Sequence, residues 1–242
     1  MNAGQSIRLH ATAPQVCNYL PDRVAVLHFA STDRRWNLPL QTLLLEHGFR
    51  RTGEHLYRPG CPTCQACIAV RVPVREFTPR RWQRRILARN GDIHIRPRPA
   101  EFVPEHFALY RRYLAQRHPR GGMDEPDPHH YMNFLHAGWA DTEFIEMRAG
   151  HQLMAVAVVD RLADGLSAVY TFFDPDHAHR SLGTYAVLRE IAETRERGLQ
   201  WLYLGYWIED CRKMRYKSGF QPLEYFRDGQ WSRHPPTPAI EA

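Results

Sequence analysis

A junction between a strand and a helix most limits the folds open to this chain. Residues 168–173 are apolar and rich in β-branched and aromatic side chains, which favours a strand, and Asp174-Pro175 ends it because Pro cannot donate to a ladder. We predict Ser181 as the N-cap of the following helix, whose apolar residues recur at helical spacing until Gly198. The helix therefore begins beside a strand end, where unpaired backbone N–H groups and the helix dipole favour an anion or a developing oxyanion.

The segments around this junction predict an antiparallel meander. Residues 143–148, 154–160 and 168–173 have strand patterns, and Ala149-Gly150 and Asp164-Gly165 mark the turns between them. After the helix, the sequence predicts a strand at 201–207, a short helix at 211–217 and a strand at 222–226. This order predicts an α+β fold with a mixed, mainly antiparallel sheet flanked by helices. It resembles the second half of the Gcn5-related N-acetyltransferase fold, so the expected architecture is GNAT-like.

The first hundred residues are predicted to form a separate α/β part. Upstream of the meander, the predicted strands are 24–29, 55–58, 68–74 and 92–96, and the predicted helices are 39–47, 79–87, 104–117 and 130–137. Residues 118–123 break the helical pattern, residues 124–128 form a Pro-containing connection, and the tail from Ser232 is expected to be loosely ordered. We therefore predict two domains, residues 1–100 with a cysteine cluster and a basic stripe, and residues 101–242 with the GNAT-like fold.

Positive charge is concentrated in one stretch. The chain has 32 Lys and Arg against 26 Asp and Glu, a net charge of +6. Residues 71–98 hold nine arginines against Glu76 and Asp92, which gives 9 − 2 = +7 for this stretch alone. A basic stripe is the electrostatic footprint of a polyanionic partner, although a solvated basic face is an equally ordinary origin of such a stretch. The helix at its centre carries the candidate nucleic-acid ligands Arg80, Arg81, Arg84 and Arg85, with Trp82 available to stack on a base.

The cysteines suggest a metal site or reduced thiols. Cys61, Cys64 and Cys67 follow one another at two-residue gaps, and Cys17 or a histidine would complete a tetrahedral zinc site or hold an iron–sulfur cluster. Reduced structural thiols account for the same spacing. The longest purely apolar run, 153–159, is too short to span a bilayer, so we expect no membrane partner and a cytoplasmic protein.

Three groups of motifs together resemble a known family. The first is Tyr57-Arg58-Pro59 with the three spaced cysteines, Arg71-Val72 and Arg84-Arg85; the second is Asp174-Pro175 with residues 180–184; the third is Tyr203 to Ile208 with Lys213-Met214-x-Tyr216-Lys217. These motifs resemble the arginyl-tRNA–protein transferase family over nearly the whole chain. The compact bacterial members transfer leucine from leucyl-tRNA to proteins that begin with Asp or Glu, marking them for N-degron degradation. Eukaryotic members carry Cys-Gly-Tyr-Cys near the start where this chain reads Cys17-Asn18-Tyr19-Leu20, so one cluster ligand is missing.

The resemblance implies an acyl transfer between two bound substrates. The acceptor's α-amino group would attack the ester of the aminoacyl-tRNA, with no covalent enzyme intermediate and no cofactor required for the chemistry. The donor end is expected at Arg180, Ser181, Leu182, Gly183 and Thr184. Asp174 is the candidate base, and Tyr206 and Lys217 are the candidates to steady charge. Arg58 and Arg71 are the candidates to bind the acceptor's acidic side chain, because an arginine fork matches a carboxylate.

Three alternative functions fit parts of the sequence. Arginine is an alternative donor amino acid in the same reaction. An acyl-CoA N-acetyltransferase would share the fold, but Tyr185 stands where its phosphate loop needs a small residue. A non-enzymatic RNA-binding metal protein would account for the arginines and cysteines but leaves residues 203–217 without a purpose. Each catalytic candidate could equally be structural: Asp174 as a turn former, Tyr206 as a core residue, Lys217 as a partner of Glu224.

Overall fold

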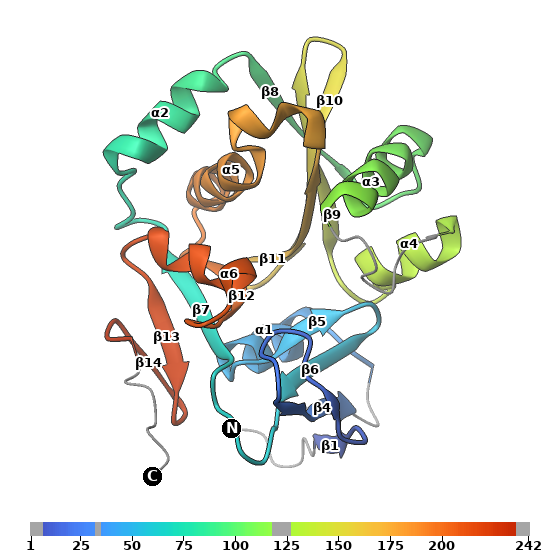
Figure 1. The fold of residues 1–242 in the computed structure, drawn as a ribbon, viewed down its shortest axis with the longest axis vertical. Coiled ribbons are helices and arrows are strands. Elements are labelled where there is room, and N and C mark those ends of the chain that lie inside the picture. Colours follow the sequence, from blue (N-terminus) through green and yellow to red (C-terminus); the bar gives the residue numbers. More distant parts are fainter. Residues whose placement is uncertain (1–6, 32–34, 118–126, 236–242) are drawn as a thin grey trace.

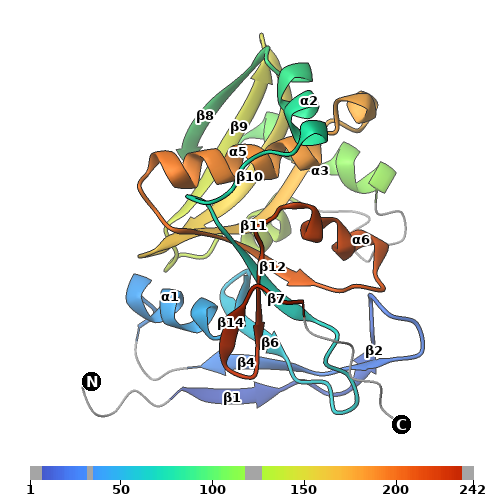
Figure 2. The same cartoon turned by 90° about the vertical axis from the view of Figure 1, so that its left-hand side faces the viewer.

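The chain folds around two β-sheets (Figure 1). The computed structural model describes residues 7–31, 35–117 and 127–235. Within them, an eight-stranded sheet runs in the order β14-β13-β7-β12-β11-β10-β9-β8, and a four-stranded sheet runs in the order β1-β4-β6-β5. The smaller sheet lies below the larger one in Figure 1 and in the perpendicular view of Figure 2.

The four-stranded sheet is built from the N-terminal part of the chain. Its strands are β1 (Arg8–Ala11), β4 (Leu27–Ser31), β6 (His55–Pro59) and β5 (Arg50–Thr52), and a short pair, β2 (Gln15–Val16) and β3 (Val24–Ala25), precedes β4. Helix α1 (Leu38–Glu46) begins where the Asn37 side chain accepts a hydrogen bond from the Leu40 N–H at 3.0 Å. This side-chain cap and Pro39 in the first turn explain why the helix begins there.

The eight-stranded sheet is antiparallel except at one pair. Its strands are β7 (Ile68–Pro73), β8 (Ile93–Pro99), β9 (Thr142–Ala149), β10 (Gln152–Arg161), β11 (Gly165–Phe173), β12 (Trp201–Trp207), β13 (Glu224–Arg227) and β14 (Gln230–Ser232). Only β11 and β12 run parallel, because α5 (Leu182–Glu196) crosses over between them. The predicted α+β fold with a mainly antiparallel sheet flanked by helices is confirmed.

Helices cover both faces of this sheet. In Figure 1, α5 and α2 (Arg81–Arg89) lie on one side, and α3 (Pro104–Arg117) and α4 (Pro128–Leu135) on the other. Strand β10 shows why: Ala155, Ala157 and Val159 pack into the core that includes α5, whereas Val156 and Val158 pack into the core that includes α3 and α4. An apolar strand buried on both faces needs a helix layer on each.

The elements predicted around the sheet are present with small shifts. The predicted helix at 211–217 is α6 (Arg212–Arg215) followed by the 3₁₀ turn η2 (Tyr216–Gly219), and a second 3₁₀ turn, η1 (Pro175–Arg180), lies between β11 and α5. The short strands β1, β2, β5 and β14 were not predicted. Residues 118–126 and 236–242, which include the predicted break and most of the tail, lie outside the described residues. Among the described helices, none has the length and apolar character needed to cross a bilayer.

The predicted N-terminal part shares its strands with the larger sheet. β7 pairs with both β12 and β13, and β8 forms the opposite edge beside β9. Residues 68–99 therefore contribute to the eight-stranded sheet, and the domain boundary near residue 100 stays a prediction.

Candidate active site

The two parallel strands separate in the middle of the eight-stranded sheet. β11 and β12 pair only from Gly165 to Ser167 and from Trp201 to Tyr203. Beyond these residues β11 stays with β10, and β12 stays with β7. The carbonyl groups along the inner edges of both strands consequently lose their ladder partners, which leaves a polar opening between the two strands.

Arg50, from the first residue of β5, occupies that opening. Its Nη1 donates to the Leu204 carbonyl oxygen at 3.1 Å, and its Nη2 donates to the carbonyl oxygens of Ala168 and Val169 at 3.1 and 2.6 Å. The guanidinium thus satisfies carbonyl groups from both separated strands. It forms no ion pair with a carboxylate in the part of the chain that the structure describes, so its charge is not neutralised there.

Gly205 makes room for this guanidinium. Its φ is +74°, and β12 has a register irregularity against β7 between Tyr203 and Gly205. A Cβ atom on Gly205 would lie 1.3 Å from Nη1 of Arg50. Both the left-handed backbone and the close approach require glycine.

Lys217 is a buried amine beside the opening. The residue is 5% exposed, and its Nζ donates to the Tyr206 carbonyl oxygen and contacts Sδ of Met214 at 3.5 Å. Burial, with a contribution from the Arg50 charge, holds the pKa of Lys217 well below its usual range. Its pairing with Glu224, considered from the sequence, does not form, because Glu224 pairs with Arg71.

Tyr206 joins the two sheets. Its hydroxyl lies 2.9 Å from the Gly48 carbonyl oxygen and 3.1 Å from that of Tyr57, and it donates to these acceptors. Burial raises the pKa of Tyr206 well above its ordinary value. The hydroxyl is therefore a neutral donor that fixes β12 against the N-terminal part, and its predicted part in catalysis stays a prediction.

Glu190 is an unpaired carboxyl group on α5. The residue is 0% exposed, and neither of its carboxyl oxygens has a hydrogen-bond partner among the described residues. Burial raises the pKa of Glu190 to about 8, and the charge of Arg50 opposes that rise. The group accordingly keeps its proton at neutral pH.

The predicted base, Asp174, shapes the turn after β11. Its carboxylate is buried and accepts hydrogen bonds from Arg112 Nη2 at 2.9 Å, Gln152 Nε2 at 3.1 Å and the Asp176 N–H at 3.1 Å. The bond from the Asp176 N–H makes Asp174 the N-cap of η1. Its role as the base stays a prediction.

The predicted donor segment is held by its side chains while its backbone leads into α5. Arg180 donates from Nε to Oδ1 of Asn90 at 3.0 Å and forms an ion pair with Asp92, and Leu182 is buried in the core. Gly183 lies against the Phe173 ring, which a Cβ atom would approach to 3.0 Å. The N–H groups of Gly183 and Thr184 belong to the first helical turn, where no intrahelical acceptor exists.

Ser181 differs from its prediction as a side-chain cap. It adopts the left-handed conformation, with φ 55° and ψ 45°, and its side chain makes no capping hydrogen bond. The reason is the 3₁₀ turn η1, which runs directly into α5, so that Ser181 ends one helical segment and begins the next.

The two predicted acceptor ligands have different surroundings. Arg71 donates from Nε to Oε2 of Glu224 at 2.9 Å, and its guanidinium carbon lies 3.7 Å from the ring centroid of Trp201 and 4.2 Å from that of Trp231. Its charge is thus already paired inside the protein. Arg58 is half-buried, lies over the Phe49 ring at 5.1 Å and forms no ion pair within the described residues.

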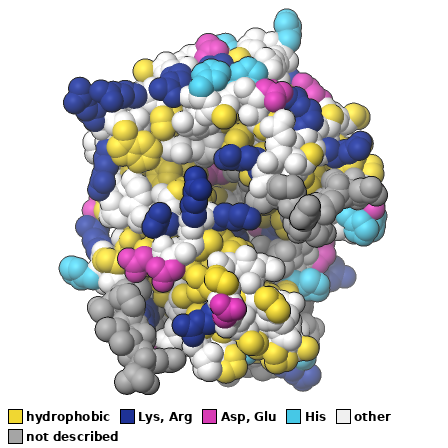
Figure 3. Space-filling view, in the orientation of Figure 1, with side chains coloured by type: hydrophobic (Ala, Val, Ile, Leu, Met, Phe, Trp, Pro, Cys, Tyr) yellow, Lys and Arg dark blue, Asp and Glu magenta, His cyan; other side chains and the backbone are white. Residues whose placement is uncertain are grey.

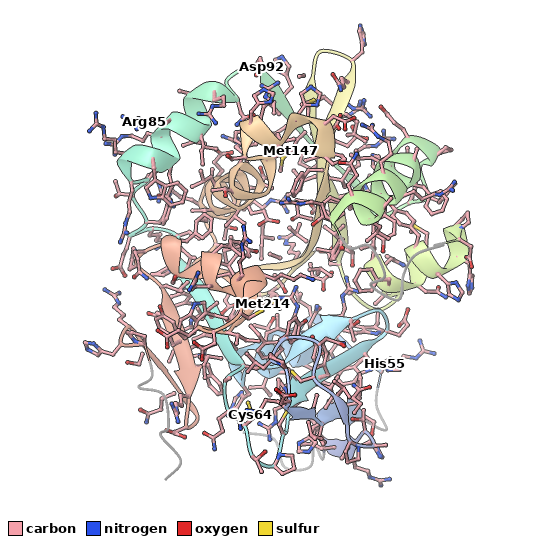
Figure 4. The ribbon with its side chains drawn as sticks, in the orientation of Figure 1. His55, Cys64, Arg85, Asp92, Met147 and Met214 are labelled. Atoms are coloured by element: carbon pink, nitrogen blue, oxygen red, sulfur yellow. The ribbon has the colours of Figure 1, made fainter. Side chains whose placement is uncertain are left out.

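The arginines of α2 extend into solvent. Arg80, Arg81, Arg84 and Arg85 are all exposed, while Gln83 and Ile86 form the buried face. Figure 4 shows Arg85 directed away from the molecule. These side chains are free to contact phosphates.

The predicted metal ligands are four cysteines of the N-terminal part. Cys17, Cys61, Cys64 and Cys67 are free and half-buried, and burial together with the neighbouring thiols raises the pKa of Cys67 to about 12. Figure 4 shows Cys64 in the lower half of the molecule, beside the smaller sheet. Throughout the described ranges, no three or more His, Cys, Asp or Glu side chains are grouped closely enough to hold a metal ion. The zinc or iron–sulfur site predicted at these cysteines stays a prediction.

Sequence reasoning missed Arg50 and Glu190. The doubled Arg50-Arg51 after the Gly48 turn was a weak signal, since nothing local shows that one guanidinium enters the larger sheet. For Glu190, the signal was an acidic residue on the buried face of a helix, one turn from Ala186 and Thr194, which are also buried.

Comparison with known proteins matches nearly the whole chain. Residues 15–85 match the family model described as "Arginine-tRNA-protein transferase, N terminus", and residues 105–227 match "Arginine-tRNA-protein transferase, C terminus". The chain is 50% identical to an aspartate/glutamate leucyltransferase of Nitrosococcus oceani over 92% of this chain and 94% of the relative. It is 49% identical to an aspartate/glutamate leucyltransferase of Pseudomonas aeruginosa over 93% of this chain and 96% of the relative.

A solved structure also resembles part of the fold. The C-terminal domain of a lysylphosphatidylglycerol synthetase from Agrobacterium fabrum matches with a TM-score of 0.47 and 14% sequence identity, covering 60% of this chain and 47% of that chain. The family assignment depends on the sequence matches, which span both halves of the chain and agree with the motifs around Arg58, Gly183 and Lys217. The chain is an enzyme that belongs to the arginine-tRNA–protein transferase family.

Proposed function

We propose that the enzyme transfers leucine from leucyl-tRNA to the α-amino group of proteins that begin with Asp or Glu, and so marks them for N-degron degradation. The names of its relatives at 49–50% identity support leucine as the transferred residue and acidic N-termini as the acceptors. The observation that carries the proposal is the guanidinium of Arg50, which lies between the separated strands with no carboxylate partner among the described residues.

The opening between β11 and β12 supports an acetyltransferase-like fold. The antiparallel β9–β10–β11 meander, the crossover helix α5 and the parallel strand β12 follow the order of the GNAT-like architecture. We place the reaction at this opening, with residues 1–100 and 101–242 as its N-terminal and C-terminal domains. An aminoacyl-tRNA donor also implies a cytoplasmic location.

The acceptor's acidic side chain is proposed to bind Arg50, with Arg58 nearby. A carboxylate can pair with a partly buried guanidinium that keeps hydrogen-bonding capacity, and such charge-assisted bonds are strong away from water. Arg71, the other candidate from the sequence, forms the wall of the site through Trp201 and Trp231. Its partner Glu224 would compete with any carboxylate that approached.

Lys217 is proposed to accept the proton of the attacking ammonium group. Because its pKa is lowered, Lys217 can be a neutral amine and accept a proton. The acceptor's α-ammonium group, which must lose that proton, has a pKa of roughly 7.7–8.0. The free amine then forms the C–N bond to the leucyl carbonyl carbon, and the ester C–O bond breaks. The attacking nitrogen loses a second proton in this step, which passes to the departing ribose oxygen, and Lys217 releases the first proton to solvent. No electron leaves the substrates, so we propose that the transfer requires no cofactor.

The start of α5 is proposed to stabilise the tetrahedral intermediate. The first-turn N–H groups of Gly183 and Thr184 have no intrahelical acceptor, and the positive end of the helix dipole lies there. Holding amine and ester in attack geometry can supply roughly 7–11 kcal/mol by itself. The exposed arginines of α2 are proposed to bind the phosphates of the donor tRNA.

The test compares labelled leucyl-tRNA with labelled arginyl-tRNA as donors to peptides that begin with Asp, Glu, Lys or Ala. We expect leucine on the Asp and Glu peptides only. Transfer of arginine to the same peptides would mean that the enzyme catalyses the proposed reaction with arginyl-tRNA as its donor. Transfer from acetyl-CoA instead, or tRNA binding without transfer from either donor, would contradict the proposal.

A further inference from the structure

Two exposed aromatic side chains lie on neighbouring elements beside the active site. Trp82 is 41% exposed at the start of α2, and Tyr216 is 49% exposed at the start of η2. A Cβ atom on Gly219 would lie 3.3 Å from Cζ2 of Trp82, so the indole packs on the turn that Tyr216 begins. Gln83 Nε2 donates to the Gly219 carbonyl oxygen at 3.2 Å and fixes α2 to that turn. The fold thus joins two aromatic residues that are far apart in the sequence.

Exposed cations lie on α2, which carries Trp82, and on α6, which directly precedes Tyr216. They are Arg81, Arg84 and Arg85 on α2, and Arg212, Lys213 and Arg215 on α6. None of these side chains forms an ion pair within the described residues, and the nearby acidic residues Glu209 and Asp210 precede α6. Figure 3 shows basic side chains gathered over α2 and over the centre of this face, with hydrophobic atoms between them. We refer to Trp82, Tyr216 and these six cations as the aromatic–basic surface.

The aromatic–basic surface continues into the active site. Tyr216 is followed directly by the buried Lys217, whose Nζ lies 5.8 Å from the Tyr216 ring centroid. Burial raises the pKa of the Tyr216 hydroxyl to about 12, with a contribution from Glu190, although the residue's outer edge is exposed. One ring therefore reaches from the solvent-exposed surface to the interior groups beside the strand opening.

We propose that the aromatic–basic surface binds the unpaired 3′ end of the donor tRNA, with bases stacked on Trp82 and Tyr216 and phosphates held by the cations of α6. This inference rests on the proposed function, because it requires a tRNA donor. Unpaired bases stack on exposed aromatic rings without sequence preference, and basic side chains follow their phosphates. The nucleotides next to the leucyl ester must lie at the edge of the active site, and this surface is at that edge.

The first experiment measures the affinity for deacylated leucine tRNA at several salt concentrations. Tyr216→Ala and Trp82→Ala should each weaken binding about tenfold through lost stacking. Tyr216→Phe keeps the ring and should retain the affinity. Lys213→Ala should weaken binding and lower the slope of log affinity against log salt by about one. Arg8→Ala, on exposed β1 in the smaller sheet, is the charge-matched control and should change neither quantity.

The second experiment removes the unpaired 3′ nucleotides from the tRNA and needs no protein variant. The wild-type protein should bind the shortened tRNA as weakly as Tyr216→Ala binds the intact one, and Tyr216→Ala should then cause no further loss. Equal wild-type affinity for the intact and shortened tRNAs would overturn the inference, even if the alanine variants fail to fold. Leucine transfer by the wild type is measured in parallel. If leucine is transferred but the intact and shortened tRNAs bind with equal affinity, this inference is wrong and the proposed function stands. If the shortened tRNA binds more weakly but no leucine is transferred, the proposed function is wrong and this inference stands.

Discussion

Two neighbouring residues of β5 place a guanidinium in opposite environments. Arg51 is buried and donates from Nε and Nη2 to the carboxylate of Asp160 at 2.5 and 2.8 Å, with the Leu135 carbonyl oxygen as a further acceptor. Arg50 meets only backbone carbonyl groups. The two side chains leave the strand on opposite faces, as successive residues of a strand do.

The difference separates a cation paired with a carboxylate from a cation that contacts only backbone carbonyl groups among the described residues. Asp160 also accepts from Gln41 and Thr142, so the Arg51 pair is the centre of a closed network that connects α1, β5, β9 and β10. Such a network has no capacity left for a substrate. Arg50 is held in place by neutral dipoles, and its uncompensated charge is available to an anion.

Breaking the Arg51 pair should have the largest effect. Arg51→Ala leaves a buried carboxylate without its counter-ion, and we expect a loss of about 3–5 kcal/mol in the free energy of unfolding, measured by urea denaturation. The double variant Arg51→Ala with Asp160→Asn should recover part of that loss. A stability equal to that of the wild type would contradict a structural role for the pair.

Removing the unpaired guanidinium should affect transfer more than folding. We expect Arg50→Ala to lower kcat/KM for Asp- and Glu-starting peptides by about 10- to 100-fold, which corresponds to one lost charge-assisted hydrogen bond in a buried site. Its unfolding free energy should change less than that of Arg51→Ala. Arg50→Lys keeps the charge and should recover only part of the activity. If the ratio of kcat/KM for acidic and neutral acceptor peptides is the same in Arg50→Ala as in the wild type, Arg50 does not recognise the acceptor side chain.

A side chain added at Gly205, beside Arg50, should also lower transfer to acidic acceptors, by less than Arg50→Ala does. In Gly205→Ala the new methyl group occupies the position of Nη1, and the guanidinium must move while the backbone keeps a positive φ. We expect a loss of about 1–2 kcal/mol in stability and reduced use of acidic acceptors. Gly198→Ala has a similar φ and open space around it, so it should reproduce the loss of stability without the change in acceptor preference. The same acceptor preference in both variants would contradict the prediction.

The effect expected at Glu190 is absent at acidic pH and grows as pH rises. Its pKa is about 8 in the folded protein, against 4.5 for an ordinary glutamate, so the folded state holds a proton that the unfolded chain releases as pH rises from about 4.5 to 8. Stability from this group is therefore lost across that interval. At pH 8, Glu190→Gln should be more stable than the wild type by up to about 4 kcal/mol, and near pH 4.5 the two should be nearly equal. Glu196→Gln, exposed on the same helix, is the control, and an equal Tm difference at both pH values would contradict the interpretation.

The sequence predicted the larger elements because their information is local. The apolar alternation of the β9–β10–β11 meander and the helical spacing up to Gly198 are complete within each segment, and these elements were confirmed. The two-residue strand β2 is too short to show a period, and the strand predicted at 24–29 is divided into β3 and β4. The capping role of Ser181 was wrong because a 3₁₀ turn before it, invisible to a residue-type rule, sets a left-handed backbone.

The site was less predictable because its partners come from distant segments. No local pattern distinguishes Arg50 from Arg51, since their difference depends on Asp160 and on the carbonyl groups of β11 and β12. Arg71 was a reasonable candidate for a carboxylate ligand, and the structure shows that the carboxylate it binds is the protein's own Glu224. This partner depends on the pairing of β7 with β13, which no local pattern shows.

The position of β7 has a consequence for how activity arises during synthesis. β7 lies between β12 and β13, and Arg50 meets a carbonyl group 154 residues further along the chain. A nascent or truncated chain that ends before β13 has every arginine of the N-terminal part but an unfinished sheet. The strand opening itself needs β12, which ends at Trp207, so most of the polypeptide must be synthesised before Arg50 can contact both edges of the opening.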